Sequence, residues 1–274
     1  MFFGNYSKPG KGVNKRDPNQ PRNQVFFDIL PRRMWKLIKL NIVYLLLSLP
    51  FFVVTMLIVG VISSPMVNSI SSSLDNLNIL KIDLALRFLL ALVFMIFFGQ
   101  GPLTAGFTYI IREIGREHHC WLVGDFIKET KSNFKQGTIL WIIDLIVLYS
   151  VVIAFKFYLH RNMLVFIGIL TFAVAVYGMI HIYAYQMMIT FDLSLKNILK
   201  NSLLLAFGNL PVSLLIFFMN LIVYIIIPVM CISMCNSSFW LSFIYVFELL
   251  ILPPITNFAT NFYIEPILDK YIKK

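Results

Sequence analysis

Six apolar segments dominate this sequence of 274 residues, and each is long enough to cross a lipid bilayer. A helix rises about 1.5 Å per residue, so about 20 mostly apolar residues cover the hydrocarbon core. In lipid every backbone N–H and C=O must be bonded within the protein, which favours the α-helix for runs of this length. The sequence therefore predicts an all-α, polytopic transmembrane helical bundle. Its spans are expected near residues 40–62, 86–111, 138–159, 163–190, 211–235 and 238–260.

The composition agrees with lipid as the solvent. Hydrophobic residues make up 59% of the chain and charged residues 13%, and the mean hydropathy is +0.80. Soluble proteins average about 45–50% apolar and about 25% charged residues. In a soluble protein the formal net charge of +10 would suggest a nucleic-acid partner. Beside apolar segments it instead predicts contact with the anionic cytoplasmic leaflet of the lipid bilayer, and we expect no nucleic-acid partner.

Lysine and arginine residues fall almost entirely on one side of the expected spans. With six spans, 19 of the 23 basic residues lie before the first span, after the second and fourth, and after the sixth. Cytoplasmic flanks carry an excess of Lys and Arg. We therefore expect a multi-pass protein of the cell membrane with cytoplasmic N- and C-termini. The first apolar run begins near residue 40, too far in for a cleavable signal peptide.

The chain divides into a tail and one membrane domain. Residues 1–24 are rich in Pro, Gly and Lys and predict a flexible basic N-terminal tail. Residues 25–274 predict a single transmembrane domain. This domain opens with residues 25–39, which mix large apolar groups with cations, as expected for a helix at the membrane surface.

Paired lysines precede each span that is expected to run outward from the cytoplasm. Within each pair the lysines lie three or four residues apart, share a helix face and are followed by an asparagine. We expect three helical hairpins, each introduced by an amphipathic cytoplasmic helix. The alternative is that the cytoplasmic flanks are simply rich in lysine. The predicted basic surface consists of Lys36, Lys39, Lys128, Lys131, Lys196 and Lys200.

A second repeated pattern supports this grouping. One spacing occurs twice, in Pro102, Thr104, Thr108 and Glu113 and in Pro254, Thr256, Thr260 and Glu265. The first and third hairpins are therefore expected to resemble each other in the same orientation, as parallel repeats do in some transporters. Chance agreement is the alternative.

The second span contains the sharpest interruption. Proline frees a backbone carbonyl and kinks a helix, and the glycines beside it weaken the helix further. We expect this stretch to split the span into two half-helices. The residues of the candidate helix break are Gly99, Gln100, Gly101, Pro102, Thr104 and Gly106.

Three ionisable residues are expected at membrane depth, namely Asp144, His181 and Glu248. A charge there costs about 2.5–3.5 kcal/mol on insertion scales, so each is a candidate functional residue. Asp144 and His181 lie at similar depth in spans joined by a short turn, so a hydrogen bond or ion pair between them is geometrically sensible. The functional interpretation is a proton or solute site. The structural alternative, which the sequence favours, is a polar contact between packed helices.

No pattern of catalytic or metal-ligating residues stands out. His118, His119 and Cys120 are adjacent, but zinc needs three or four ligands at recognisable spacings and no second Cys/His pair lies in the cytoplasmic segments. A solvated loop is the better interpretation. The three cysteines give no disulfide framework. We expect no metal, no cofactor and no catalytic residues.

Several motifs resemble the YesL-like family of bacterial membrane proteins, in a longer variant found in Gram-positive bacteria. They are Trp35–Asn41, Ser48–Pro50, Gly101–Gly106 running to Tyr109 and Arg112, Trp121, Asp125-Phe126, Asn133–Gln136 and Gly208–Pro211. The resemblance covers roughly residues 30–260. It implies no established activity, but such proteins are often encoded beside carbohydrate ABC importers, their sensors and glycoside hydrolases. A role in sugar uptake is an expectation by analogy.

Three functions follow as hypotheses. The first is a non-enzymatic accessory or regulatory membrane protein linked to carbohydrate uptake, which contacts sugar ABC importer or sensor subunits through its basic face. The second is a small-solute transporter or channel that uses the broken second span and the intramembrane Asp, His and Glu. The third is an intramembrane enzyme, for which Arg112, Glu113 and His118 are the only candidates.

Overall fold

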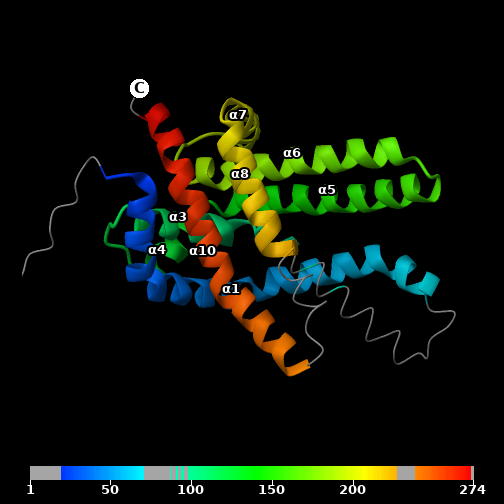
Figure 1. Cartoon of the computed structure of the whole chain (residues 1–274), viewed down its shortest axis with the longest axis horizontal. Helices are drawn as coiled ribbons and strands as arrows, with labels where there is room; N and C mark the ends of the chain where they lie inside the picture. The colour runs from blue at the N-terminus through cyan, green and yellow to red at the C-terminus, as the bar shows by residue number, and fades with distance from the viewer. Residues whose placement is uncertain are drawn as a thin grey trace, which may run out of the picture.

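The computed structural model describes residues 20–70, 98–226 and 238–272 and positions 87, 91, 94 and 95, with side chains except at 62–70, 225–226, 238–248 and 272. Every regular element within these residues is helical (Figure 1). Predictions for the first 19 residues, for Cys231 and Cys235, and for the side chain of Glu248 lie outside the described residues.

The first helix is longer than the sequence predicts. α1 (Arg22–Ile70) joins the expected surface helix and the first span in 49 continuous residues. Its first turns run across the direction of the rest of the helix (Figure 1). The helix also begins inside the segment predicted as a flexible tail. The reason is that the Arg22 guanidinium bonds the carbonyl of Phe262 and lies 4.4 Å from the centre of its ring.

The next two helices form a tight unit. α3 (Pro102–Gly115) packs against α4 (Leu122–Ser132), which carries Lys128 and Lys131. Gly106 makes this approach possible, because a methyl group there would lie 2.8 Å from the carbonyl oxygen of Phe126.

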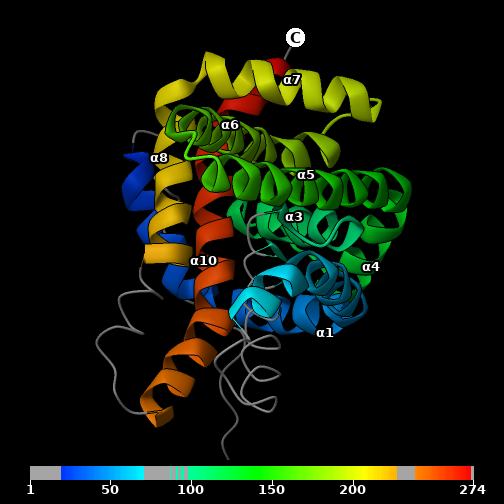
Figure 2. The same cartoon turned by 90° about the vertical axis from the view of Figure 1, so that its right-hand side faces the viewer.

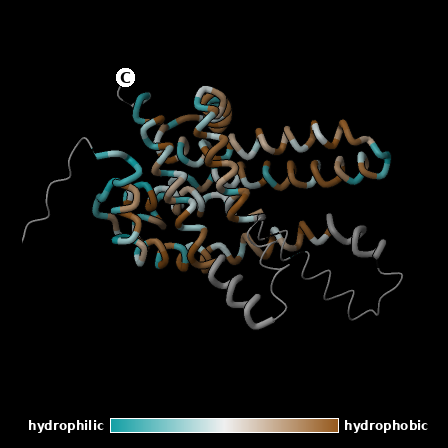
Figure 3. The backbone as a smooth tube through the Cα atoms, in the orientation of Figure 1, coloured by the Kyte–Doolittle hydropathy of each residue, from teal (hydrophilic) through white to brown (hydrophobic). Residues whose placement is uncertain are grey.

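α5 (Phe134–His160) and α6 (Leu164–Met188) run antiparallel, side by side in both views (Figure 1, Figure 2). The turn between them contains Asn162 with φ of 54°, a left-handed conformation that asparagine tolerates better than most residues. Both helices match predicted spans closely. Large apolar side chains such as Leu164, Val165 and Phe172 are exposed, as expected for lipid contact. Both helices are coloured mainly as hydrophobic in Figure 3.

The C-terminal part of the chain forms α7, α8, η2 and α10. α7 (Leu195–Gly208) is bent by 100° from α8 (Leu210–Leu221), which continues into η2 (Ile222–Ile226). α10 (Ser238–Ile272) crosses the other helices diagonally (Figure 1) and packs against α1, α3, α6 and α8.

Three helices of the described residues are long and apolar enough to span a membrane: α1 up to Val61, α5 and α6. The bent pair α7–α8 adds a fourth if it forms one span. The structure therefore supports a membrane-embedded helical protein. Six spans in three hairpins, with cytoplasmic termini, stay a prediction.

The predicted interruption of the second span coincides with a change of backbone conformation. Gly99 and Gly101 have φ of 77° and 58°, which is the region that favours glycine. α3 then begins at Pro102. Proline lacks an N–H, and this costs nothing here because an N–H at the first position of a helix has no partner within the helix. The backbone of this turn lies directly on α5, because a methyl group on Gly137 would lie 2.7 Å from both Cα and N of Pro102.

This close approach gives the first prediction. Gly137→Ala should lower the free energy of unfolding by about 1–3 kcal/mol, because its methyl group meets backbone that cannot rotate away. Gly168→Ala on α6 is the matched control, since nothing lies within 4 Å of a methyl group there. Thermal unfolding in detergent should show a loss for the first variant only. Equal effects would contradict the close packing of the break against α5.

Candidate functional site

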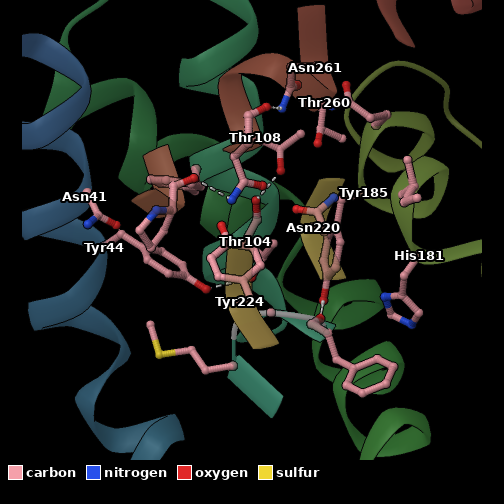
Figure 4. Close-up of a pocket in the computed structure, with 18 of the residues that line it drawn as sticks. Asn41, Tyr44, Thr104, Thr108, His181, Tyr185, Asn220, Tyr224, Thr260 and Asn261 are labelled. Atoms are coloured by element: carbon pink, nitrogen blue, oxygen red, sulfur yellow. Dashed lines mark hydrogen bonds between the residues drawn. The ribbon is translucent and has the colours of Figure 1, made fainter. Parts of the chain in front are cut away.

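A polar cavity lies inside the helical bundle, between α1, α3, α6, α8 and α10 (Figure 4). Its volume is about 100 Å³. A single buried water requires about 10–15 Å³, so the cavity has room for several waters or a molecule of comparable size. Its polar lining comes from Asn41, Tyr44, Thr104, Thr108, His181, Tyr185, Gln186, Asn220, Tyr224, Asn257, Thr260 and Asn261.

Asn41 connects the cavity to the proline pair of α10. Pro253 and Pro254 have no N–H, so they leave the carbonyls four residues earlier, Leu249 and Leu250, without helical partners. The side-chain amide of Asn41 donates to these two carbonyls, at 2.9 and 3.0 Å. A fully buried side chain of α1 thus replaces both lost hydrogen bonds of α10. Its own oxygen, Oδ1, has no hydrogen-bond partner within the described part of the chain.

Thr104 holds the opposite wall of the cavity. Its hydroxyl accepts the backbone N–H of Gln100 at 2.6 Å, inside the helix break, and lies 3.1 Å from the hydroxyl of Tyr44 on α1. Tyr185 of α6 donates to the carbonyl of Phe98 at 3.1 Å. Side chains from two other helices therefore fix the backbone of the break.

The repeated Pro–Thr–Thr spacing has a structural counterpart. Thr104 and Thr256, each two residues after its proline, both bond a tyrosine hydroxyl, from Tyr44 and Tyr224 respectively. The second threonines of the two patterns, Thr108 and Thr260, both line the cavity (Figure 4). The cavity therefore lies between two interrupted helices that present similar groups to it.

The structure brings Asp144 and His181 together. The Asp144 carboxylate accepts from Tyr177 at 2.6 Å and lies 2.7 Å from Nε2 of His181. Asp144 is fully buried and His181 is 5% exposed. His181 also lines the cavity, whereas Asp144 lies behind it on α5. Nδ1 of His181 has no partner among the described residues, and in the neutral ring whose Nε2 donates to the carboxylate it is a hydrogen-bond acceptor.

Other residues of the predicted sites lie elsewhere. The backbone of Glu248 belongs to α10, five residues before Pro253. Gly106 faces α4, and Gln100 is buried without contributing to the cavity lining. The lysines of the predicted basic surface lie away from the cavity. Lys36 is half-buried. The other five are exposed, namely Lys39, Lys128, Lys131, Lys196 and Lys200.

The residues considered for metal binding or catalysis near α3 have structural partners. His118 bonds Glu113 at 2.8 Å, and Arg112 bonds Thr190 at 2.6 Å. Cys120 is buried, and burial raises the pKa of its thiol. Within the part of the chain that the structure describes, no group of three or more His, Cys, Asp or Glu residues could hold a metal ion.

An ionic cluster outside the cavity joins three helices. Arg116, the residue directly after α3, pairs with Glu265 and lies 3.3 Å from Asp269, both on α10, and Arg22 of α1 lies 3.7 Å from Glu265. Burial disfavours the charged form of Arg116, but the hydrogen bond and charge of Glu265, together with Asp269, outweigh it and raise the pKa of the guanidinium. The cluster fixes the ends of α1 and α3 against α10.

The asparagines and tyrosines of the cavity were missed by sequence reasoning. Only ionisable groups were singled out within the spans, whereas Asn41, Asn220, Asn257 and Asn261 are neutral. A usable signal existed, because an amide inside an apolar span requires a hydrogen-bond partner and therefore faces other helices or a cavity.

The fold and cavity support a membrane-embedded α-helical protein with a cavity among its helices that polar and apolar side chains line. Residues 37–155 match the model of a family described as a protein of unknown function, DUF624. The matched region runs from α1 through the break, α3 and α4 into α5, and it contains Asn41, Thr104 and Asp144. No curated protein and no solved structure matches the chain. The resemblance to YesL-like proteins stays a prediction.

The contact between Asn41 and α10 gives the second prediction. Asn41→Leu removes the donor but keeps the size of the side chain, and leaving buried carbonyls unbonded should cost about 1–3 kcal/mol. Pro253→Ala with Pro254→Ala restores the two missing N–H groups, so the same Asn41→Leu change should then cost much less. A double-mutant cycle on unfolding free energies measures this coupling. A cost of Asn41→Leu that is independent of the prolines would contradict the assignment.

Proposed function

We propose that the protein is a non-enzymatic membrane protein that binds a small polar solute in the intramembrane cavity. One observation carries the proposal: three buried side chains that line a cavity inside an apolar bundle, Asn41, His181 and Asn261, each have a polar atom with no partner among the described residues. Each unbonded polar group in such surroundings costs about 1–3 kcal/mol, so a chain retains them where water or a ligand supplies the bonds. Packing alone would be served better by apolar side chains.

The position of the cavity supports solute binding of the transporter type. In transporters built from repeats, substrates bind where helices are interrupted, because the free backbone groups and the local gap provide the site. Here the cavity touches the Gly99 break on one side and Pro253 on the other. His181 supplies a titratable group at the same place, held by Asp144 and Tyr177. We therefore favour solute binding, with transport as the activity it would serve.

The non-enzymatic part of the proposal rests on the environment of His181. Its Nε2 is engaged by Asp144, and within the described residues no hydroxyl or thiol bonds its Nδ1. A nucleophile activated by histidine needs that contact. In this proposal, the role of Asp144 is to hold the imidazole ring of His181 in a fixed orientation at the cavity wall.

An accessory role in carbohydrate uptake is the second candidate. The observation that favours it is the exposed surface of α4: Trp121 at the start of the helix is 72% exposed, and Lys128 and Lys131 further along it are exposed as well. This surface would contact anionic lipid or the subunits of a sugar importer or its sensor. Solute binding and the accessory role are compatible, since a sensor also needs a binding site.

Cysteine accessibility tests the proposed function. In a chain with Cys120, Cys231 and Cys235 replaced by alanine, Thr108→Cys places a thiol in the cavity and Thr171→Cys places one on the exposed outer face of α6. The thiolate is the reactive form and needs water, so 2-hydroxyethyl methanethiosulfonate should modify position 108 faster in membranes. Equal, slow modification at both positions would show a dry cavity and leave the accessory role as the better account.

A further inference from the structure

We propose that the cavity binds an uncharged solute that carries several hydroxyl groups, the chemical class of polyols and monosaccharides. This inference rests on the proposed function and specifies its ligand. The groups that line the cavity are amides, hydroxyls, aromatic rings and one imidazole. Three features of this lining lead to the ligand class: the absence of fixed charge, the surplus of acceptors and the aromatic walls.

The described lining contains no Lys, Arg, Asp or Glu. Transferring an ion from water to such a place is costly unless an opposite charge compensates it. The nearby carboxylate of Asp144 lies behind the lining, where one oxygen bonds both Tyr177 and His181 and the other has no partner among the described residues. The cavity therefore favours a neutral occupant over an anion.

Three residues of the lining carry acceptors that have no partner among the described residues, and an occupant that reaches these acceptors must bring donors. The acceptors are Oδ1 of Asn41, Oδ1 of Asn261 and Nδ1 of His181, on three different helices. All three side chains are more than nine-tenths buried. Each acceptor requires a donor, and donors on several sides of one small molecule are what adjacent hydroxyl groups provide. A hydroxyl also accepts, so the hydroxyls of Thr108 and Thr260 can bond the same occupant.

Aromatic rings complete the walls. Tyr44 and Phe107 lie 4.6 Å apart between ring centres on one side, and Phe98, Tyr185 and Phe217 contribute to the other sides. Their apolar faces suit the C–H groups of a hydroxylated carbon chain, while the hydroxyls of the tyrosines remain engaged with Thr104 and the Phe98 carbonyl. A fully polar occupant such as a hydrated ion would leave these faces unused.

The test uses the full chain purified in detergent, with erythritol as the probe and sodium chloride, choline chloride and sodium acetate for comparison. Erythritol in the millimolar range should raise the melting temperature with a saturable dependence, because binding to the folded state stabilises it. The three salts should give no saturable shift.

A matched pair of variants separates binding from a general solvent effect. Thr108 and Thr171 both donate to the carbonyl four residues earlier, at 2.7 and 2.9 Å, and valine keeps the shape of either side chain. Thr108→Val should raise the Kd for erythritol about five- to tenfold, as expected for one lost hydrogen bond, while Thr171→Val leaves it unchanged.

Three outcomes would overturn parts of the account, and they are distinguishable. A saturable shift with sodium, choline or acetate that Thr108→Val removes, without an erythritol effect, would leave solute binding standing and refute the ligand class. An erythritol effect identical in both valine variants would be a cosolvent effect and would refute the assignment. A chain that no probe stabilises, and whose cysteine at position 108 is unreactive, would refute the proposed function itself.

Discussion

The structure depends on one constraint: a helix interrupted inside an apolar bundle must have its free carbonyls bonded by other parts of the protein. Pro253 and Pro254 create two such carbonyls in α10, and the Asn41 amide bonds both. This contact fixes the register of α1 against α10, the two helices that are furthest apart in the sequence. The side-chain oxygen of Asn41, a residue that lines the cavity, is left as an acceptor with no partner among the described residues.

At the second interruption, Gly99–Pro102, the free backbone groups are bonded by different partners. Its backbone packs on α5 at Gly137, and its N–H and C=O groups are bonded by Thr104 and Tyr185. A gap remains between the two interrupted helices beside Thr108 and Thr260, although α3 and α10 pack against each other elsewhere. Neutral amides and hydroxyls line that gap, and their unmet hydrogen-bonding capacity is the physical basis for assigning solute binding to it.

The sequence was sufficient for the features that follow from local chemistry. Apolar run length identified α5 and α6 nearly to their ends, and glycine beside proline located the break at Gly99–Pro102. The similar depth of Asp144 and His181 in consecutive spans made a contact between them geometrically sensible without deciding whether they pair, and the structure contains a hydrogen bond. The cavity was not foreseen, because it depends on which helices lie together. Nothing local in Asn41 indicates that its partners are carbonyls 208 and 209 residues away. The extent of α1 also escaped prediction, since its start depends on the distant contact of Arg22 with Phe262.

The central claim is that Asn41 bonds the carbonyls freed by the proline pair and leaves its oxygen to an occupant of the cavity. An experimental structure of the full chain in lipid nanodiscs, at a resolution that shows ordered water, tests this most directly. The account predicts the amide of Asn41 within hydrogen-bonding distance of the Leu249 and Leu250 carbonyls, and ordered water or solute beside the side-chain oxygens of Asn41 and Asn261. A collapsed, dry interior in which apolar side chains fill the space between α1, α3 and α10 would contradict it.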